Sequence, residues 1–400
     1  MGTTLQAPPF ELALDSALWS SELLASERGR AQLDKLHRTW LDAGADIVET
    51  CTYQSSLPLF LPASRAPTAD ELSTALDTMT SALPVACGSC ASASSSSAAS
   101  SSSSSGPKPQ VALSLGPYGS ALQPGQEYTG AYPPPFGPAA SAAPDARPAS
   151  GAAALDAVPL PLDAVRAGDD GVSDVEAHLA AWHLQRLEHF TSPSAEGAQP
   201  VGLVAFETVP SLAEVRAIRR AVATFSRLYP SRPQLPFYIS LVFPRADPAG
   251  DATEVRFPDA ALAHLGPRLD AQLPPLVEAL LAPEQGYALP AGLGFNCTSP
   301  LAARGVVRAL GRAVAEQAPA AKPWLVLYPD GGAVYDVRTR SWTHPAGLTD
   351  GAWAELVADA VGDALESGQW EGVVAGGCCK AGPGAIKALR DEVTKRGWTE

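Results

Sequence analysis

The sequence lacks several features that define large classes of proteins. No apolar stretch approaches the roughly 20 residues that cross a bilayer, and residues 1–6 have neither a basic flank nor a hydrophobic segment, so we expect no membrane partner and no secretory signal. Basic charge is also scarce: 28 Lys and Arg stand against 42 Asp and Glu, and the net charge of −14 argues against nucleic acid as a partner. We therefore expect a cytoplasmic protein. The acidic balance suits cationic small molecules, but such a balance more often serves solubility alone.

Cysteine is sparse as well, with six residues in a chain of 400. Six cysteines do not make a disulfide framework in so long a chain, and without an export signal they are expected to be free thiols or metal ligands in a reducing compartment. Cys87 and Cys90 have a C-x-x-C spacing, but no strand precedes them and no second pair exists, so packing is the favoured interpretation. Cys51 is also interpreted as a packing residue.

The hydrophobic fraction of 46% excludes global disorder, and the apolar residues form alternating strand-like and helix-like segments. Short apolar runs predict strands at residues 45–53, 110–115, 201–207, 237–242, 293–296, 324–328 and 372–375. Helical periodicity predicts helices at residues 15–43, 68–83, 174–190, 211–225, 301–316, 351–367 and 383–395, with others around Ala260 and Leu276. Strands that are apolar without alternation are typical of a parallel sheet covered on both faces.

This pattern predicts an α/β fold, a (β/α)8 TIM barrel, in a single domain over residues 1–400. Seven strands are counted and Gly2–Leu5 resembles the end of another, so the barrel is expected to lack part or all of its first strand. A doubly wound open sheet is the alternative, which the lack of a Gly-rich phosphate motif disfavours. Two insertions are expected: a Ser/Ala-rich disordered stretch at 86–109, and a Pro/Ala-rich stretch at 132–167 that is either a lid or disordered.

Three cysteines at predicted strand ends indicate a metal site. Cys378 and Cys379 follow the last strand, and Cys297 follows an earlier one. Consecutive strand residues point to opposite faces, so both neighbouring thiols can bind one ion only where the backbone bends, which Gly376-Gly377 permits. Three thiolates would hold Zn²⁺ with one open position, where a thiol substrate would lose its proton. The alternative is that these cysteines pack as small apolar residues.

Glu207 ends a strand that is otherwise apolar. A carboxylate in that place either caps the helix that follows or binds a cationic group at the mouth of the barrel, and the residue alone does not decide between the two. Tyr53 and Ser114 also lie at predicted strand ends, on the same face of the barrel.

Motifs from one end of the chain to the other resemble those of the homocysteine S-methyltransferase family. The matching stretches are Gly2–Leu5, Ala43–Gln54, Ser114–Gly119, Glu127–Tyr132, Ala205–Pro210, Gly294–Pro300, Tyr328–Gly332 and Gly376–Cys379. The resemblance implies a zinc (β/α)8 barrel in which Cys297, Cys378 and Cys379 are the zinc ligands. It further implies that Glu207 holds the amino group of homocysteine and that Tyr53 lies near the substrate. Ser114 is expected to be a third substrate-binding residue, and no catalytic residue is expected beyond zinc activation of the substrate thiol.

The reaction implied by the resemblance is transfer of a methyl group from a sulfonium donor, S-methylmethionine or S-adenosylmethionine, to the thiolate of L-homocysteine, giving methionine. Alternatives are a related barrel that methylates another thiol or uses a betaine-like donor, and a truncated barrel without activity. Family members begin with a strand that ends Asp-Gly-Gly, whereas this sequence starts after that point, so we expect the protein to start upstream of Met1. Asp330 stands where the family usually has asparagine.

Overall fold

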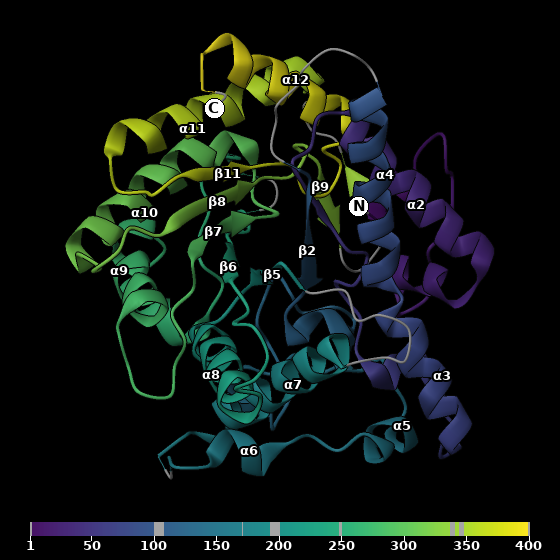
Figure 1. The fold of residues 1–400 in the computed structure, drawn as a ribbon. Coiled ribbons are helices and arrows are strands. Elements are labelled where there is room, and N and C mark those ends of the chain that lie inside the picture. The colour runs from purple at the N-terminus through teal and green to yellow at the C-terminus, as the bar shows by residue number, and fades with distance from the viewer. Residues whose placement is uncertain are drawn as a thin grey trace.

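The computed structural model describes residues 2–99, 108–169, 171–192, 201–247, 250–336, 341–343 and 348–398. Its centre is a parallel sheet of seven strands in the order β1-β2-β5-β6-β7-β8-β11. These are β1 (Ile47–Glu49), β2 (Gln110–Leu115), β5 (Leu203–Val209), β6 (Phe237–Val242), β7 (Gly292–Asn296), β8 (Trp324–Tyr328) and β11 (Val373–Ala375). The sheet is curled into a half-barrel, and Figure 1 shows it surrounded by helices. The predicted barrel-type α/β fold, with seven strands, is confirmed.

The central strands are buried on both faces, as their apolar sequences require, whereas the edge strands β1 and β11 are partly exposed. Every residue of β6 and of β7 is buried, and these two strands pair in register over five residues. Successive side chains alternate between the two faces. Leu113 of β2 therefore packs in the large cluster shared with the helices, whereas Ala112 joins Ala205, Tyr238 and Val326 in a small inner cluster. Parallel strands place their carboxyl ends at one mouth of the half-barrel, where polar residues can gather.

The outer helices bring the chain back after each strand. They include α2 (Glu27–Asp42), α3 (Ala69–Thr80), α7 (Asp174–Thr191), α8 (Leu212–Leu228), α9 (Leu269–Leu281), α10 (Ala303–Gln317), α11 (Asp350–Ser367) and α12 (Pro383–Lys395). The helix predicted at residues 15–43 is divided into η1 (Trp19–Ala25) and α2. The division falls at Ser26, whose backbone is extended and whose side chain accepts from Gly29 N at 3.0 Å, so that Ser26 caps α2.

The two edge strands of the sheet are β1 and β11, and the region between them is called the seam. Within the described part of the chain, β1 pairs with β2 alone and β11 with β8 alone. Arg390 of α12, the helix that follows β11, reaches the segment before β1: its Nη2 donates to Gly44 O at 2.7 Å, and its guanidinium pairs with Asp46. These contacts join α12, and not β11 itself, to the segment before β1.

Gly2–Leu5 is the short helix α1, not the end of a strand as the sequence suggested. The segment turns back on itself, with Leu12 N donating to Leu5 O at 2.8 Å, and Leu5 is fully buried with Phe10 and Leu14. Thr3 Oγ1 accepts from Lys380 N at 3.0 Å, which places this segment beside the loop after β11. Burial of Leu5 in this local cluster therefore replaces pairing with the sheet.

Both insertions differ from unstructured loops over their described residues. The Ser/Ala stretch continues α4 (Ala82–Ala99), where the sequence suggested disorder, and residues 100–107 of it lie outside the described part. Alanine is the strongest helix former, and Ser89 anchors α4 to α2 by donating to Asp34 Oδ1 at 2.6 Å. The Pro/Ala stretch contains η4 (Ala139–Ser141), β4 (Arg147–Pro148), α5 (Ala152–Ala157) and α6 (Leu162–Arg166), and β4 pairs with β3 (Leu122–Gln123). Its buried Tyr132 and Val165 pack into the main core.

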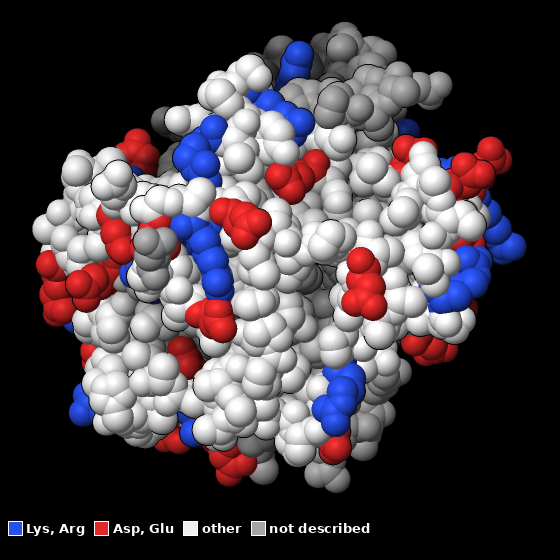
Figure 2. All heavy atoms as spheres, turned by 90° about the horizontal axis from the view of Figure 1, so that it is seen from below, with Lys and Arg blue, Asp and Glu red and all other residues white. Residues whose placement is uncertain are grey.

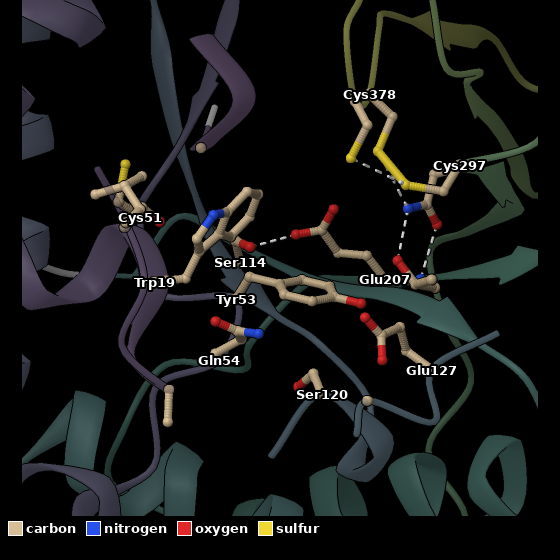
Figure 3. Close-up of a pocket in the computed structure, with 18 of the residues that line it drawn as sticks. Trp19, Cys51, Tyr53, Gln54, Ser114, Ser120, Glu127, Glu207, Cys297 and Cys378 are labelled. Atoms are coloured by element: carbon tan, nitrogen blue, oxygen red, sulfur yellow. Dashed lines mark hydrogen bonds between the residues drawn. A yellow bond between two sulfur atoms is a disulfide. The ribbon is translucent and has the colours of Figure 1, made fainter. Parts of the chain in front are cut away.

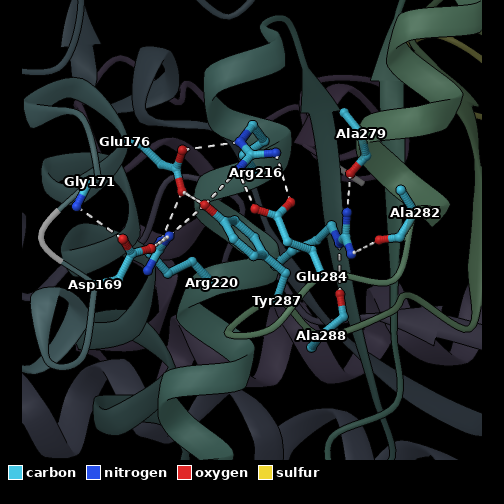
Figure 4. A network of polar contacts seen from close by, with 11 residues as sticks. Asp169, Gly171, Glu176, Arg216, Arg220, Ala279, Ala282, Glu284, Tyr287 and Ala288 are labelled. Carbon is cyan, nitrogen blue, oxygen red and sulfur yellow. Dashed lines mark hydrogen bonds and ion pairs between the residues drawn. The ribbon is translucent and has the colours of Figure 1, made fainter.

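A partly buried polar network fastens α7 to α8 (Figure 4). Glu176 of α7 accepts from Arg220 Nε at 2.8 Å and from Arg216 Nε at 3.2 Å, both on α8. Arg216 also pairs with Glu284 at 3.0 Å, in the segment before β7, and donates to the hydroxyl of Tyr287 at 2.7 Å. Charged groups removed from water are stabilising only when paired in this way. The network holds α7 in a fixed position against the sheet.

The surface is mixed in charge. Figure 2 shows Lys and Arg interspersed with Asp and Glu over the face in view, without a broad basic area. A search of the described helices finds none that is both long enough and apolar enough to cross a bilayer.

Candidate functional site

The six residues predicted for the site line one cavity of about 300 Å³ at the carboxyl ends of the strands. They come from distant parts of the sequence: Tyr53 follows β1, Ser114 lies in β2, Glu207 in β5, Cys297 follows β7, and Cys378 and Cys379 follow β11. A cavity at this mouth is where a barrel of parallel strands places its chemistry. The structure therefore brings together all of the residues that the sequence singled out.

The three strand-end cysteines form a compact sulfur cluster (Figure 3). Their Sγ atoms all lie within 4.8 Å of one another, and Cys297 Sγ is 4.0 Å from Cys379 Sγ. Cys297 and Cys378 are joined as a disulfide, with their Cα atoms 5.5 Å apart. Three sulfur atoms at this spacing can bind a common metal ion as thiolates, whereas oxidation of two of them removes two ligands.

The loop after β11 presents both neighbouring thiols to the cavity because its backbone bends there. Cys378 N donates to Pro329 O at 2.8 Å, and Cys379 O accepts from Gly331 N at 2.7 Å, so the bend is fixed against the loop after β8. A side chain at Gly377 would collide with Ala381, which explains a glycine directly before the cysteines. Asp330 lies behind this bend, where its Oδ1 accepts from Gly332 N at 2.7 Å; it does not line the cavity.

Asn296, directly before Cys297, ties the sulfur cluster to the strand of Glu207. Its Nδ2 donates to Thr208 Oγ1 at 2.7 Å, and its Oδ1 accepts from Ser240 Oγ at 2.8 Å. Thr208 and Cys297 both have left-handed backbones, with φ of 60° and 47°, which non-glycine residues adopt at a cost of order 1–3 kcal/mol. The buried amide of Asn296 offsets part of that cost by satisfying the groups at both turns.

Glu207 faces the cavity and does not cap the following helix. Ser211 caps α8 by accepting from Glu214 N at 3.2 Å, while the Glu207 carboxylate accepts from Ser114 Oγ. Burial, and secondly the nearby carboxyl of Glu49, raise the pKa of Glu207 to about 8. A carboxyl in this state has a strong preference for a cation, because a positive charge beside it restores the ionised form. Of the two roles that the sequence left open, these contacts exclude capping, and cation binding remains a prediction.

The cavity as a whole is acidic. Asp15, Glu49, Glu127 and Glu207 line it, and no Lys, Arg or His is among the described residues that do so. Glu49 accepts from Tyr238 Oη at 3.2 Å, and burial raises its pKa. Burial also raises the pKa of Glu127 to about 7. Several carboxyls in a low-dielectric cavity without a basic partner favour a positively charged ligand.

Arg186 of α7 supports the floor of the site. Its fully buried guanidinium donates to Gly116 O at 2.7 Å, to Ser55 O at 2.8 Å and to Tyr53 O at 2.9 Å. These carbonyls belong to the loops after β1 and β2, so one side chain sets the position of both. Arg186, a residue of an outer helix, thus helps to position Tyr53 in the cavity through the hydrogen bond to its carbonyl.

Comparisons with known proteins identify one family. The model of the family described as homocysteine S-methyltransferase matches residues 1–393. The chain belongs to the homocysteine S-methyltransferase family. It is a methyltransferase, and the family supports methyl transfer to homocysteine.

Individual relatives of this family are distant but cover nearly the whole chain. Homocysteine S-methyltransferase 4 of Zea mays is 24% identical over 97% of this chain and 86% of its own length. Betaine-homocysteine S-methyltransferase of Drosophila melanogaster is 26% identical over 94% of this chain and 87% of its own length. The apo structure of the homocysteine methyltransferase MmuM from Escherichia coli has a TM-score of 0.38 and 16% identity, covering 90% of this chain and 85% of that one.

Three residues of this homocysteine S-methyltransferase site escaped the sequence analysis. Glu49 lies in the middle of the predicted strand 45–53, whereas the observed β1 ends at Glu49, so the misplaced strand end hid this residue. Glu127 lies in a stretch that resembles the family, but it is in a loop, and a loop sequence does not predict which way its side chain points. Arg186 sits within a predicted helix, and no local pattern reveals its contacts with loops more than 60 residues away.

Proposed function

We propose that this chain transfers a methyl group from a sulfonium donor to the thiolate of L-homocysteine, giving methionine, with zinc as its cofactor. The observation that carries the proposal is the cluster of three cysteine sulfurs within 4.8 Å of one another, in the same cavity as the amine-binding candidate Glu207. The metal activates a thiol, and the carboxylate positions the amino acid that bears it. A cytoplasmic location, where thiols stay reduced, suits this chemistry.

The donor set of Cys297, Cys378 and Cys379 fits zinc. Three thiolates are a common zinc environment and leave one tetrahedral position for a substrate. Burial raises the pKa of the Cys379 thiol to about 12, so a cation is required to hold this group as a thiolate at neutral pH. When bound, zinc supplies a position in which a substrate thiol ionises and becomes nucleophilic.

The protein's own residues orient the amino acid around that position. Glu207 binds the ammonium group of homocysteine, and Ser114 fixes the carboxylate by donating to it. Tyr53 lines the same cavity and limits where the substrate chain can lie. Because a cationic donor and an anionic thiolate react to give uncharged sulfur groups, exclusion of water from the cavity favours the reaction. Positioning of the two sulfur atoms in line supplies a further large part of the acceleration.

Cavity size favours a small donor. A volume of about 300 Å³ lies at the lower end of the roughly 300–1,000 Å³ of ligand pockets, so homocysteine leaves little space for a nucleoside. S-methylmethionine therefore ranks before S-adenosylmethionine. A betaine-like donor is the second candidate, favoured by the similarity to the betaine-homocysteine S-methyltransferase of Drosophila melanogaster.

A panel of donors tests this function. Reduced, zinc-loaded protein is incubated with homocysteine and, separately, with S-methylmethionine, S-adenosylmethionine or glycine betaine, and methionine is quantified together with bound zinc. The expected result is about one zinc per chain and fastest turnover with S-methylmethionine. Zinc-free protein that is fully active would overturn the role of the metal, and absence of methionine with every donor would overturn the reaction.

A further inference from the structure

Glu127 differs from the other buried acids of the cavity because one of its oxygens has no partner. Glu207 accepts from Ser114, and Glu49 accepts from Tyr238. Oε2 of Glu127, in contrast, is buried and makes no hydrogen bond within the described structure. A buried carboxylate oxygen without a partner is costly, so its presence calls for a ligand that the protein alone does not contain.

The position of Glu127 is fixed by its backbone. Gln126 N donates to Gly119 O at 3.0 Å, and Gly130 N donates to Gln126 O at 2.9 Å, which closes a turn around Glu127. The turn packs so closely on Gly119 that a side chain there would collide with Glu127 N. The backbone that carries this carboxylate is therefore held in place before any ligand arrives, which limits the positions that the side chain can take.

The surroundings of Glu127 suit a cation that carries methyl groups. Figure 3 shows its carboxylate at the hydroxyl end of Tyr53, on the other side of that ring from Glu207. Burial, and after it the carboxyls of Glu127 and Glu207, raise the pKa of Tyr53, so both carboxyls lie near enough to interact with its phenol. Tyr128 lines the cavity as well. Aromatic faces and a carboxylate together are the surroundings that onium groups prefer.

We propose that Glu127 is the counter-ion of the methyl donor and, with Tyr53 and Tyr128, forms an onium subsite separate from the amine site at Glu207. This inference rests on the proposed function, in which the amine of homocysteine takes Glu207 and a second cation must be accommodated. In the transfer, a lone pair of the acceptor thiolate forms the new S–CH₃ bond. The bond from methyl to the donor onium atom breaks, and its electron pair stays on that atom, which becomes neutral. No proton or external electron is consumed.

Binding of charged and neutral ligand pairs tests the subsite directly. Calorimetric titrations compare S-methylmethionine with methionine, and glycine betaine with 3,3-dimethylbutyrate, on wild type, Glu127→Gln, Glu127→Asp and Glu355→Gln. Glu355 is exposed on α11 and serves as the matched control. The charged member of the preferred pair identifies the onium class, sulfonium or quaternary ammonium.

Wild type should prefer one onium ligand to its neutral counterpart by about tenfold, a typical value for one partly desolvated charge contact. Glu127→Gln should abolish that preference while changing the affinity of the neutral ligand less than about twofold. Glu127→Asp should keep part of the preference, and Glu355→Gln all of it. Equal affinity of the onium and neutral ligands in wild type, or an equal effect of Glu127→Gln on both, would overturn the subsite.

Turnover separates this inference from the proposed function. Wild type could form no methionine and still prefer the onium ligand, with that preference absent in Glu127→Gln. The proposed reaction would then fail, and the cation site would stand. If wild type is active and Glu127→Gln leaves the KM of the donor unchanged, the reaction stands and the subsite fails. Thermal unfolding shows that Glu127→Gln is folded, and an equal or higher Tm is expected because a buried charge without a partner is removed.

Discussion

Asn296 donates a hydrogen bond to Thr208 Oγ1 at 2.7 Å and accepts one from Thr208 N, also at 2.7 Å. Thr208 follows Glu207, and Asn296 precedes Cys297. The two residues therefore connect the strand end that carries Glu207 with the strand end that carries Cys297. A single buried amide keeps the two halves of the proposed substrate site at a fixed separation.

Replacement of Asn296 by alanine should affect both stability and catalysis. The substitution removes the acceptor of Thr208 N and of Ser240 Oγ, and each unsatisfied buried group costs about 1–3 kcal/mol, so we expect a loss of about 3 kcal/mol in the free energy of unfolding. Urea denaturation measures the loss, and steady-state kinetics at a temperature where the variant is folded should show a lower kcat. A variant with wild-type stability and kcat would contradict the role of this amide.

Replacement of Cys378 by serine should remove both the metal and the activity. With two sulfur ligands instead of three, bound zinc should fall from about one per chain to near zero, and kcat/KM should fall by on the order of 100-fold or more. Metal content is measured by mass spectrometry after desalting. Cys87→Ser on α4, outside the cavity, is the matched control and should keep both properties. Oxidation of wild type to the Cys297–Cys378 disulfide should have the same effect as Cys378→Ser, and reduction should reverse it.

Replacement of Glu207 by glutamine should weaken homocysteine binding selectively. The amide keeps the size of the side chain but loses the charge that attracts the ammonium group, so we expect the KM of homocysteine to rise about tenfold or more. Bound zinc should remain at the wild-type level, because Glu207 is not one of the clustered sulfur ligands. An unchanged KM, measured at saturating donor, would refute the amine-binding role.

The stability of the ligand-free protein should fall as the pH rises from 6.5 to 8. Glu127 and Glu207 have folded-state pKa values of about 7 and about 8, above the ordinary value of 4.5, because burial disfavours their charged forms. In this window the folded state holds protons that the unfolded state has already released, so the free energy of unfolding decreases with rising pH. The buried His37 and His189, whose pKa values burial lowers to about 4, act in the opposite direction, but mainly below pH 6.5.

Chemical denaturation at several pH values measures this effect. Glu127→Gln should show a shallower decrease than wild type, because one of the groups with a raised pKa, which also include Glu207 and the buried Asp330 with a pKa of about 7, no longer titrates. A stability that rises between pH 6.5 and 8 would contradict the raised pKa values.

The sequence was sufficient for the strands and for the sulfur cluster because both depend on local patterns. An apolar run of five residues such as Trp324–Tyr328 is typical of a buried parallel strand. The carboxyl end of each such strand lies at the mouth of the barrel where the active site forms. A prediction of the strands therefore also predicts where the residues directly after them lie, namely Cys297, Cys378 and Cys379. The roles of these residues and of Glu207 remain predictions until the variants are measured.

Other parts of the site depend on contacts that no local pattern contains. Arg186 is 131 residues from Ser55, whose carbonyl it holds, and only the packing of α7 brings them together. The turn that carries Glu127 packs on Gly119, and this contact sets the orientation of the turn. The residues of the turn alone do not predict that orientation. Residues 86–99 of α4 were predicted to be disordered for a different reason: low complexity suggests disorder, but alanine favours a helix, and α2 offers a surface to pack on.

The seam between β1 and β11 divides the half-barrel into regions of unequal local stability. Amides in β6 and β7 lie between paired neighbours, whereas β1 and β11 each have one partner among the described strands, and Arg390 of α12 contacts the segment before β1. Local opening should therefore start at the seam, and hydrogen exchange should be fastest there. Tyr53 follows one edge strand and the Cys378–Cys379 pair follows the other, so the least stable part of the sheet should be the part that flanks the mouth of the cavity.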